Sequence, residues 1–264
     1  MGTFSADSER LAIFLTIFVV MAVVERLWPR RERIAAVTPR WTANFVLMAL
    51  GAVLTRALFP AAAVGAALWA EARGFGLLNH LDWPRPIETV LAVASLDLVI
   101  YWQHRLFHRI PWLWRLHAVH HTDLDLDASS GVRFHPFEIA LSMCVKVAAV
   151  AALGISSAAV VLFEVLLNAT AVFNHANAAL PPAADGLLRL LVVTPDMHRV
   201  HHTTEREEQD SNFGFNLPWW DRLFGTYRAQ PRSGHVGAQL GLAEERNPEA
   251  LRVTALLLRP FRKA

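Results

Sequence analysis

Residues 87–121 read IETVLAVASLDLVIYWQHRLFHRIPWLWRLHAVHH, and this stretch decides which fold the chain can adopt. Its first half, 87–103, is an apolar run about as long as a short membrane-spanning helix. The run passes directly into two histidine motifs, His104-Arg-Leu-Phe-His108 and His117-Ala-Val-His120-His121. Side chains three or four residues apart share one face of a helix, so each motif gathers its imidazoles on one stripe. The stretch therefore predicts an apolar helix that ends at a cluster of histidines.

The whole chain is too apolar for an ordinary soluble domain of its size. Of its 264 residues, 54% are hydrophobic and 18% are charged, and the mean hydropathy is +0.30. Segments that could cross or nearly cross a bilayer occur at 11–28, 41–59, 87–103, 137–153 and 155–173. We therefore predict an all-α integral membrane protein with about four to five transmembrane helices, the last two joined as a tight hairpin at 154–157.

Arginines beside the first two apolar segments predict how the chain is oriented. Short loops rich in Arg and Lys stay on the cytoplasmic side, so we expect the loop 29–40 there. Counting spans from this loop places 60–86 outside, and 104–136 and 174 onward inside. All clustered histidines then form a helical cap on the cytoplasmic face. The arginines fit a membrane surface better than nucleic acid; they are Arg26, Arg30, Arg31, Arg33 and Arg40.

A third motif, His198-Arg-Val-His201-His202, and His175 after the fifth apolar segment complete the predicted metal ligands. A catalytic zinc needs about three protein ligands and a structural zinc about four, so this set exceeds one site and implies two ions. Adjacent helical residues diverge by about 100°, so His120 and His121 can reach different ions. The nine predicted ligands are His104, His108, His117, His120, His121, His175, His198, His201 and His202.

Three other classes of metal protein fit the sequence less well. A membrane metal transporter or sensor would carry polar or histidine residues through its spans, whereas these clusters lie at span ends and in loops. A purely structural zinc protein is disfavoured by the excess of ligands, and the metalloprotease signature is absent because no glutamate follows His104. We interpret the isolated His80 and His235 as ordinary surface or loop residues, and Cys144 as inert packing.

Asp97 is the clearest candidate for a supporting residue inside an apolar segment. It shares a helical stripe with His104 and His108. Its carboxylate could accept the second N–H of a ligand and fix the tautomer, or it could pair with an arginine such as Arg105 or Arg115. The sequence leaves these two interpretations open.

Three more residues are expected to support the ligands without binding metal. His135 precedes a proline, which favours extended backbone. Asp196 is interpreted mainly as the N-cap of the helix that bears the third motif. Asn177 follows His175 by two residues.

Several other features receive no chemical role. Glu138, Lys146, Glu164 and Asn168 are interpreted as interhelical polar pairs. The aromatic segment 212–225 is interpreted as an interfacial belt, with a lid over a lipid channel as the bolder alternative.

Taken together, the three histidine boxes among hydrophobic spans resemble the fatty acid hydroxylase and sterol desaturase superfamily. Smaller matches are the run from Asp97 to His108, Arg133-Phe134-His135-Pro136, Asn174-His175, and 220–226 after the last box. The resemblance covers roughly residues 90–228. It divides the single expected domain into N-terminal membrane-anchoring helices (1–86), a catalytic region (87–228) and a C-terminal tail (229–264).

The resemblance implies a histidine-bound di-iron centre that uses dioxygen to hydroxylate a lipid C–H bond, with desaturation as the second possibility. Two iron ions would be the cofactors. The chain has no Gly-rich nucleotide fingerprint and no haem or Fe–S cysteine motif, so electrons would come from a separate donor, cytochrome b5-like or ferredoxin-like. The alternative is a membrane metal-binding protein without oxygenase activity.

Overall fold

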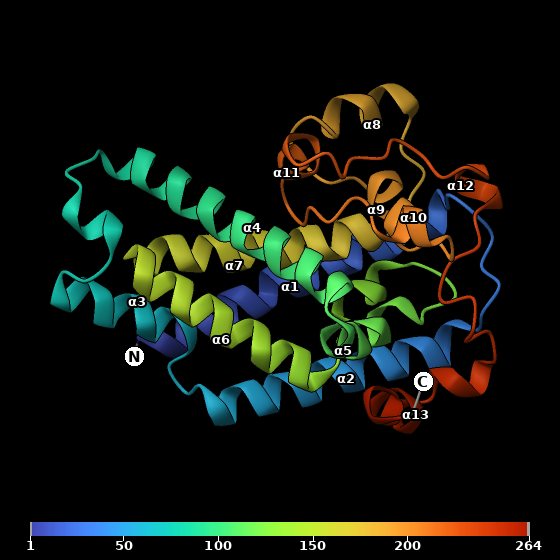
Figure 1. The fold of residues 1–264 in the computed structure, drawn as a ribbon, viewed down its shortest axis with the longest axis horizontal. Helices are drawn as coiled ribbons and strands as arrows, with labels where there is room; N and C mark the ends of the chain where they lie inside the picture. Colours follow the sequence, from blue (N-terminus) through green and yellow to red (C-terminus); the bar gives the residue numbers. More distant parts are fainter. Residues whose placement is uncertain (1, 263–264) are drawn as a thin grey trace.

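The computed structural model describes residues 2–262, which form helices and turns without a named strand; two isolated β-bridges join Pro29 to Ala178 and Thr203 to Leu240. Long helices run along the molecule (Figure 1): α1 (Gly2–Leu27), α2 (Val37–Leu58), α4 (Arg85–Arg109), α6 (Pro136–Leu153) and α7 (Ser157–His175). The predicted all-α fold is confirmed. Each of the five predicted apolar segments lies largely within one of these helices.

Shorter elements connect and cover the long helices. They are α3 (Ala62–Arg73), η1 (Leu77–His80), α5 (Pro111–His121), η2 (Ala128–Val132), α8 (Pro182–Leu188), α9 (Pro195–His201), α10 (Arg206–Gln209), α11 (Trp219–Leu223), α12 (Gly234–Gly237), η3 (Pro248–Leu251), α13 (Val253–Leu258) and η4 (Arg259–Phe261).

Three segments of the described chain are long and apolar enough to cross a membrane: Val37–His80, which contains α2, α3 and η1, then α6 and α7. This is fewer than the predicted four to five. The helices α1 and α4 do not qualify, because α1 carries charged residues toward both ends and α4 carries Asp97 and its histidine motif. Their outer faces are nevertheless apolar, with Val19 57% and Val90 67% exposed.

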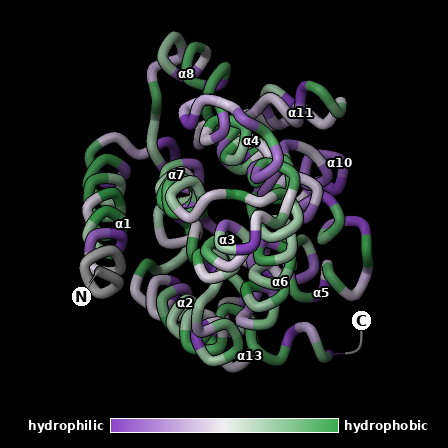
Figure 2. Tube along the Cα trace, turned by 90° about the vertical axis from the view of Figure 1, so that its left-hand side faces the viewer, coloured by the Kyte–Doolittle hydropathy of each residue, from purple (hydrophilic) through white to green (hydrophobic). Residues whose placement is uncertain are grey.

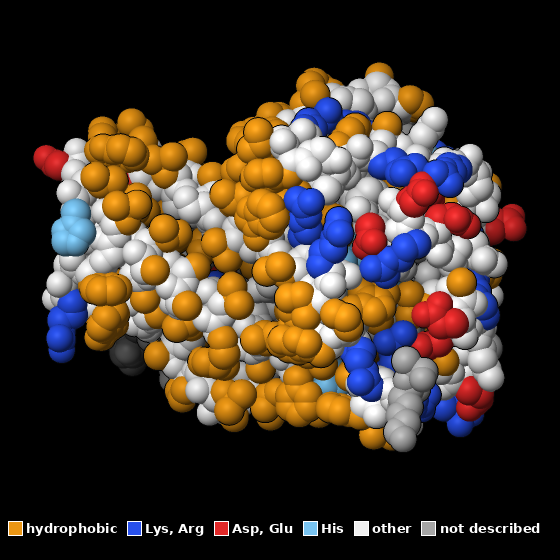
Figure 3. Space-filling view, viewed as in Figure 1, with side chains coloured by type: hydrophobic (Ala, Val, Ile, Leu, Met, Phe, Trp, Pro, Cys, Tyr) orange, Lys and Arg blue, Asp and Glu red, His pale blue; other side chains and the backbone are white. Residues whose placement is uncertain are grey.

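The exposed surface divides into an apolar part and a charged end. On the face seen in Figure 3, hydrophobic side chains cover most of the left and lower parts, whereas charged side chains gather at the right. Exposed apolar surface of this extent marks a contact with membrane or protein. The distribution therefore fits a helical bundle embedded in lipid with one polar end outside it.

The end of the bundle remote from the histidines is closed by α3 and the α6–α7 turn. Gly76 and Gly154 approach so closely that a Cβ at residue 76 would lie 2.2 Å from the backbone nitrogen of residue 154. Both glycines have positive φ, which suits glycine best. The predicted hairpin turn at 154–157 is confirmed, since α6 ends before Gly154 and Ser156 caps α7.

The segment 60–86, expected only as an outer loop, contains a helix that belongs to the bundle. In α3 the small residues Ala63, Ala67 and Ala70 are fully buried, and α3 packs on α6 and α7 (Figure 2). Alanines at this spacing let two helix backbones approach closely.

The arginines of the loop 29–40 bind mostly within the protein. Arg30 pairs with Asp196, Arg33 with Glu25, and Arg40 with Asp123 and Asp127. These contacts hold the loop at the same end of the molecule as the histidine motifs. The loop 29–40 and the histidine motifs therefore lie at the same end of the molecule, as counting spans predicts.

Candidate metal centre

A sharp turn between α4 and α5 brings the first two histidine motifs together. Helix α4 ends at Arg109, Ile110 has extended backbone, and Pro111 occupies the first turn of α5. Proline suits this position because the first N–H groups of a helix have no intrahelical partner. The helix thus restarts in a new direction and packs on α4, which faces His104 and His108 toward the histidines of α5.

The third motif lies on the short helix α9, which Thr194 caps through its side chain and Pro195 begins. The prediction that Asp196 is the N-cap is therefore wrong. Asp196 instead pairs with Arg30 and Arg199 and lies 3.6 Å from His235 Nε2. His235, expected in a loop without a role, is thus part of this ionic cluster.

All nine predicted ligands are buried and converge in two adjacent groups, each with its ligand nitrogens within 4.8 Å of one another. We call them the first and the second histidine cluster. The first consists of His104, His108, His117, His121 and His201; the second consists of His120, His175, His198 and His202. The adjacent pairs 120/121 and 201/202 divide between the clusters, as their divergence on a helix predicts.

Hydrogen bonds fix the tautomers of two rings in the first cluster. His104 Nδ1 is 2.9 Å from the carbonyl oxygen of Phe213, and His117 Nδ1 is 2.6 Å from Glu138 Oε1. The carbonyl oxygen of Phe213 can only accept, so His104 Nδ1 donates its hydrogen and Nε2 keeps a lone pair, and Glu138 as a carboxylate imposes the same tautomer on His117. The two Nε2 atoms are only 3.1 Å apart. Facing lone pairs repel at this distance, and a cation bound by both nitrogens resolves the conflict.

The second cluster repeats this arrangement. His120 Nδ1 bonds to the carbonyl oxygen of Arg133 at 3.1 Å, and His175 Nδ1 bonds to that of Ala171 at 2.7 Å. Their Nε2 atoms are again 3.1 Å apart, as are the Nε2 atoms of His175 and His198. The donor set therefore fits a metal ion in each cluster.

Other ligand nitrogens are buried without a hydrogen-bond partner among the described residues. They are His108 Nε2, His121 Nδ1 and Nε2, His198 Nδ1, His201 Nε2 and His202 Nδ1. Buried polar atoms are normally satisfied, so this concentration points to a ligand held by the nitrogens.

The electrostatics of the clusters favour neutral imidazole, the form that binds metal. Burial, followed by the neighbouring histidines, holds the pKa of His108, His121 and His202 well below the ordinary value of 6.5. Burial also lowers the pKa of His117 to about 3.

Neither predicted role of Asp97 is found. Its carboxylate accepts hydrogen bonds from the backbone N–H groups of Asn216 and Leu217 and from Trp220 Nε1. Asp97 therefore anchors the aromatic segment to α4, and it contacts neither a ligand nor Arg105 or Arg115.

His135 and Asn177 lie at the same end of the molecule but make no contact with a ligand nitrogen. His135 caps α6 by accepting the N–H of Phe137, and its Nε2 lies 3.2 Å from the carbonyl oxygen of Leu257. Asn177 bonds to the backbone of Arg31 through its side chain. Both residues position polypeptide around the clusters.

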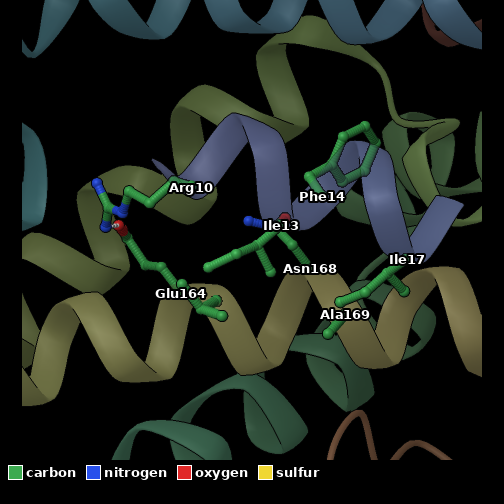
Figure 4. Close-up of a pocket in the computed structure, with 8 residues that line it drawn as sticks. Arg10, Ile13, Phe14, Ile17, Glu164, Asn168 and Ala169 are labelled. Atoms are coloured by element: carbon green, nitrogen blue, oxygen red, sulfur yellow. Dashed lines mark hydrogen bonds and ion pairs between the residues drawn. The ribbon is translucent and has the colours of Figure 1, made fainter. Parts of the chain in front are cut away.

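Sequence reasoning missed Glu138, to which it assigned no chemistry. Glu138 lies in the first turn of α6, is 3% exposed, and holds His117 Nδ1. Its place three residues after His135, in the run that follows the second motif, was the available signal. Of the residues interpreted as interhelical polar pairs, Lys146 and Glu164 pair with each other at 3.0 Å. Glu164 also binds Arg10 beside Asn168 (Figure 4).

A second omission is the ionic network directly after the second motif. Arg40 donates to Asp123 at 2.5 and 2.8 Å and to Asp127 at 2.6 Å, and all three side chains are buried. Although burial raises it, Arg40 lowers the pKa of Asp123 to about 2. Three aspartates at alternate positions, 123, 125 and 127, were the signal for a structured loop.

An elongated cavity of about 570 Å³ begins at the first cluster and runs between the long helices. His104, His117 and Glu138 line one end, whereas Arg56 and Phe59 line the other. Most of the remaining lining is apolar. On α6 the lining residues Glu138, Ser142 and Lys146 follow at intervals of four, so one face of this helix forms a wall of the cavity.

The aromatic segment 212–225 partly covers the clusters. Phe213 packs against His104, His108 and His201 with ring centroids 5.1 to 5.6 Å apart, and Phe215 lines the cavity. Trp219 is 46% exposed. Phe213 thus covers ligands of the first cluster, whereas Trp219 presents an aromatic ring at the surface.

Known proteins are similar to the chain over the same region. OlsE, an ornithine lipid hydroxylase of Rhizobium tropici, is 30% identical over 151 residues, which are 57% of this chain and 45% of that protein. Human alkylglycerol monooxygenase is 30% identical over 158 residues, 58% of this chain and 33% of that protein. The very-long-chain aldehyde decarbonylase GL1-6 of Oryza sativa subsp. indica is 26% identical over 196 residues, 70% of this chain and 28% of that protein.

The chain thus spans less than half the length of these relatives. No solved structure gives a significant match. A family model described as fatty acid hydroxylase matches residues 89–226, a region that contains all nine ligands of the two clusters. Because the match covers more than half of the chain, this protein belongs to the fatty acid hydroxylase family.

Proposed function

We propose that the two histidine clusters hold a pair of iron ions with which the protein hydroxylates a lipid C–H bond, using dioxygen and electrons from a separate carrier. The observation that carries the proposal is the pair of neighbouring clusters in which protonated Nδ1 atoms leave Nε2 lone pairs 3.1 Å apart. The names of the relatives, a lipid hydroxylase and an alkylglycerol monooxygenase, support a lipid substrate and an oxygenase reaction.

The donor set supports iron as the metal. Imidazole nitrogen suits iron, zinc, copper and nickel, but the five histidines of the first cluster exceed the three or four ligands of a zinc site. When bound, an iron pair supplies the redox chemistry that lets dioxygen oxidise an unactivated C–H bond. Everything else in the reaction depends on how this chain places the lipid and excludes water.

The residues around the ligands hold the imidazoles in fixed tautomers. Glu138 Oε1 and the carbonyl oxygens of Phe213, Arg133 and Ala171 accept the Nδ1 hydrogens of four different ligands. Such outer hydrogen bonds orient the rings and raise the basicity of the coordinating nitrogen. The chain therefore prepares both clusters before metal or substrate binds.

The cavity would hold the lipid with one carbon at the first cluster. Phe107, Phe134 and Phe215 line it beside His104 and His117, and such a surface binds hydrocarbon and excludes water. The remainder of the cavity, toward Phe59, would accept the rest of the chain. Hydroxylation is the preferred reaction because two relatives carry that kind of name, and desaturation is the second possibility.

We also propose that α1 and α4 lie in the membrane with the three apolar segments, and that the histidine end faces the cytoplasm. The arginines of the loop 29–40 and the charged end of the molecule support this orientation. The catalytic region would comprise 87–228, with 1–86 as membrane-anchoring helices and 229–264 as a tail.

Comparative lipid mass spectrometry of cells with and without the gene tests this function. A lipid that gains one oxygen only in cells with the gene supports hydroxylation, and one that loses two hydrogens indicates desaturation. An unchanged lipid profile would count against both reactions. Metal analysis is the second test, because fewer than about one iron per chain after careful loading would overturn the di-iron assignment.

A further inference from the structure

Resting on the proposed function, we propose that Trp114, Arg206 and Asp210 form the surface at which an acidic one-electron carrier protein docks and reduces the first cluster. We call these three residues the entry window. The inference depends on where side chains that contact the ligands also reach the surface. Electron transfer slows steeply with distance, so a carrier is effective only where its own redox group can approach the irons.

Trp114 is the aromatic side chain that joins the surface to the ligands. Its ring centroid lies 4.9 Å from that of His108, 5.3 Å from that of His121 and 6.3 Å from that of His117. Trp114 is partly exposed and is not part of the cavity lining. The other aromatic rings that touch the ligands are buried, as Phe107 and Phe213 are, or line the cavity, as Phe134 and Phe215 do.

Asp210 provides a second contact between surface and ligand. Its Oδ1 lies 3.3 Å from His108 Nδ1, and its side chain is 26% exposed while that of His108 is fully buried. The other residues that accept a ligand Nδ1 hydrogen, among them Glu138 and Ser211, are at most 6% exposed. Among the described residues, His108 is thus the ligand whose hydrogen-bond partner reaches solvent most openly.

Arg206 lies over both of these residues. Its guanidinium carbon is 5.2 Å from the Trp114 ring centroid, Nε is 2.9 Å from Asp210 Oδ2, and Nη2 donates to the carbonyl oxygen of His108 at 3.2 Å. Its side chain is 55% exposed. One exposed cation is therefore fixed over Trp114 and Asp210, two partly exposed side chains that contact His108.

The charge around the entry window favours an acidic partner. Arg109 and Arg115, next to His108 and Trp114 in sequence, are exposed, and the carboxylates nearest to Arg206 in sequence are Glu205, Glu207, Glu208 and Asp210. Glu208 is buried and accepts hydrogen bonds from Thr203 and from the backbone of Arg232, so it adds no exposed charge. Glu207 is already paired with Arg232 and Arg228. Positive charge therefore prevails, and electron-carrier encounters are typically small, transient and guided by complementary charge.

The test uses the full-length, iron-loaded protein and an acidic [2Fe–2S] ferredoxin as the probe. Binding of the oxidised probe and the rate at which the reduced probe is reoxidised by the enzyme are measured for wild type, Trp114→Leu, Trp114→Phe, Arg206→Gln and Arg206→Lys. Arg252→Gln is the matched control, because Arg252 is 70% exposed and pairs with Glu249 on another part of the surface. Rates are expressed per bound iron, so that any loss of metal is separated from loss of docking.

We expect Arg206→Gln to weaken probe binding roughly three- to tenfold at low ionic strength, with the difference disappearing in high salt. Trp114→Leu should slow reoxidation about tenfold with little change in affinity, while Trp114→Phe and Arg206→Lys retain most of the wild-type behaviour. The entry window is disproved if Trp114→Leu and Arg206→Gln stay within twofold of wild type, or if Arg252→Gln is equally impaired.

Failure of this inference is distinguishable from failure of the proposed function. Wild-type enzyme reduced chemically with dithionite and then given lipid and dioxygen needs no carrier. Lipid oxidation in that single turnover, combined with variants that bind and reoxidise the probe as wild type does, refutes the entry window alone. Absence of any oxidation by chemically reduced wild type refutes the proposed function itself.

Discussion

At the scale of single residues, the division of adjacent histidines between two clusters gives each ligand a distinct consequence. His120 belongs to the second cluster and His201 to the first. Replacing either with Ala removes one imidazole from a group of four or five, so we expect iron content to fall and lipid oxidation to be abolished while membrane insertion remains.

Metal analysis and lipid mass spectrometry of the two purified variants check this prediction. His80→Ala is the control, because His80 is exposed in η1 and belongs to neither cluster. Normal turnover by either ligand variant would falsify the assignment.

Glu138 offers a finer test of how the outer hydrogen bonds act. We expect Glu138→Ala to lower iron affinity about 10- to 100-fold, the usual effect of losing such a partner. Glu138→Gln should lose less, because its amide oxygen can still accept the Nδ1 hydrogen of His117. Iron titration of the apoprotein measures both, and equal affinities for wild type and the Ala variant would remove Glu138 from the site.

His135 should behave differently from the ligands although it lies within a shared motif. It caps α6 and contacts no ligand nitrogen. We expect His135→Ala to reduce stability by about 1 kcal/mol, the typical effect of losing a cap, with iron retained. Thermal unfolding and metal analysis separate the two effects. Iron loss equal to that of His120→Ala would show that His135 is a ligand.

The residue-scale predictions from sequence succeeded where chemistry is local and failed where a partner is distant in sequence. Histidine spacing on a helix predicted eight of the ligands and the separation of adjacent histidines between two sites, and the position of His175 after the fifth apolar segment predicted the ninth. The partners of Asp97 lie at 216–220 and those of Asp196 include Arg30, separations that no spacing rule covers. Thr194 is the N-cap of α9 because it directly precedes Pro195, the proline of the first helical turn.

At the scale of elements, the ion pairs of Arg40 fasten the start of α2 to the loop 123–127 that follows the second motif. Removing the guanidinium would leave Asp123 and Asp127 buried without their cation. We expect Arg40→Met to destabilise the protein by about 3 to 5 kcal/mol, and Arg40→Lys by less.

Thermal unfolding in detergent at two pH values measures this effect. Because the pKa of Asp123 is lowered to about 2, its contribution is complete above pH 4 and is lost only as the pH falls toward 2. In Arg40→Met, burial without the cation raises the pKa of the Asp123 and Asp127 carboxyls, so protonation relieves part of the penalty at lower pH and the destabilisation should be smaller at pH 5 than at pH 7. Arg26→Met, at an exposed position of α1, is the control. A midpoint unchanged by Arg40→Met would show that the network contributes nothing.

Helix periodicity could predict the long elements but not how short ones are used. The apolar runs gave all five long helices, because each is a continuous stretch of helix-compatible residues. Helix α3 was missed since its buried face consists of alanines, whose burial depends on close approach to α6 and α7. Fewer segments than expected meet the length and composition of a membrane span, because α1 and α4 carry charged residues while their outer faces stay apolar.

At the scale of the whole molecule, the five long helices form the wall of one cavity that ends at the first cluster. No local pattern predicts such a cavity, since its lining comes from α1, α2, α4, α6 and α7 at once. From the sequence we could predict only that the histidines share one end of the molecule, because successive spans alternate in direction. The cavity therefore supplies the most direct test of what the assembled bundle does.

Two neighbouring residues of α2 allow this test with a matched control. Ala52 is exposed and lines the cavity, whereas Val53 is 69% exposed and is not part of the lining. A tryptophan at position 52 would fill part of the space proposed for the lipid, so we expect Ala52→Trp to lower lipid oxidation at least about tenfold, or to shift it toward shorter chains. Val53→Trp adds the same side chain to the outer, lipid-facing surface and should leave oxidation unchanged.

Both variants should retain the iron content of wild type, because neither position contacts a ligand. Quantitative lipid mass spectrometry measures the oxidation, and metal analysis measures the iron content of each variant. Full activity of Ala52→Trp on the wild-type range of lipids would mean that the substrate reaches the first cluster by another route.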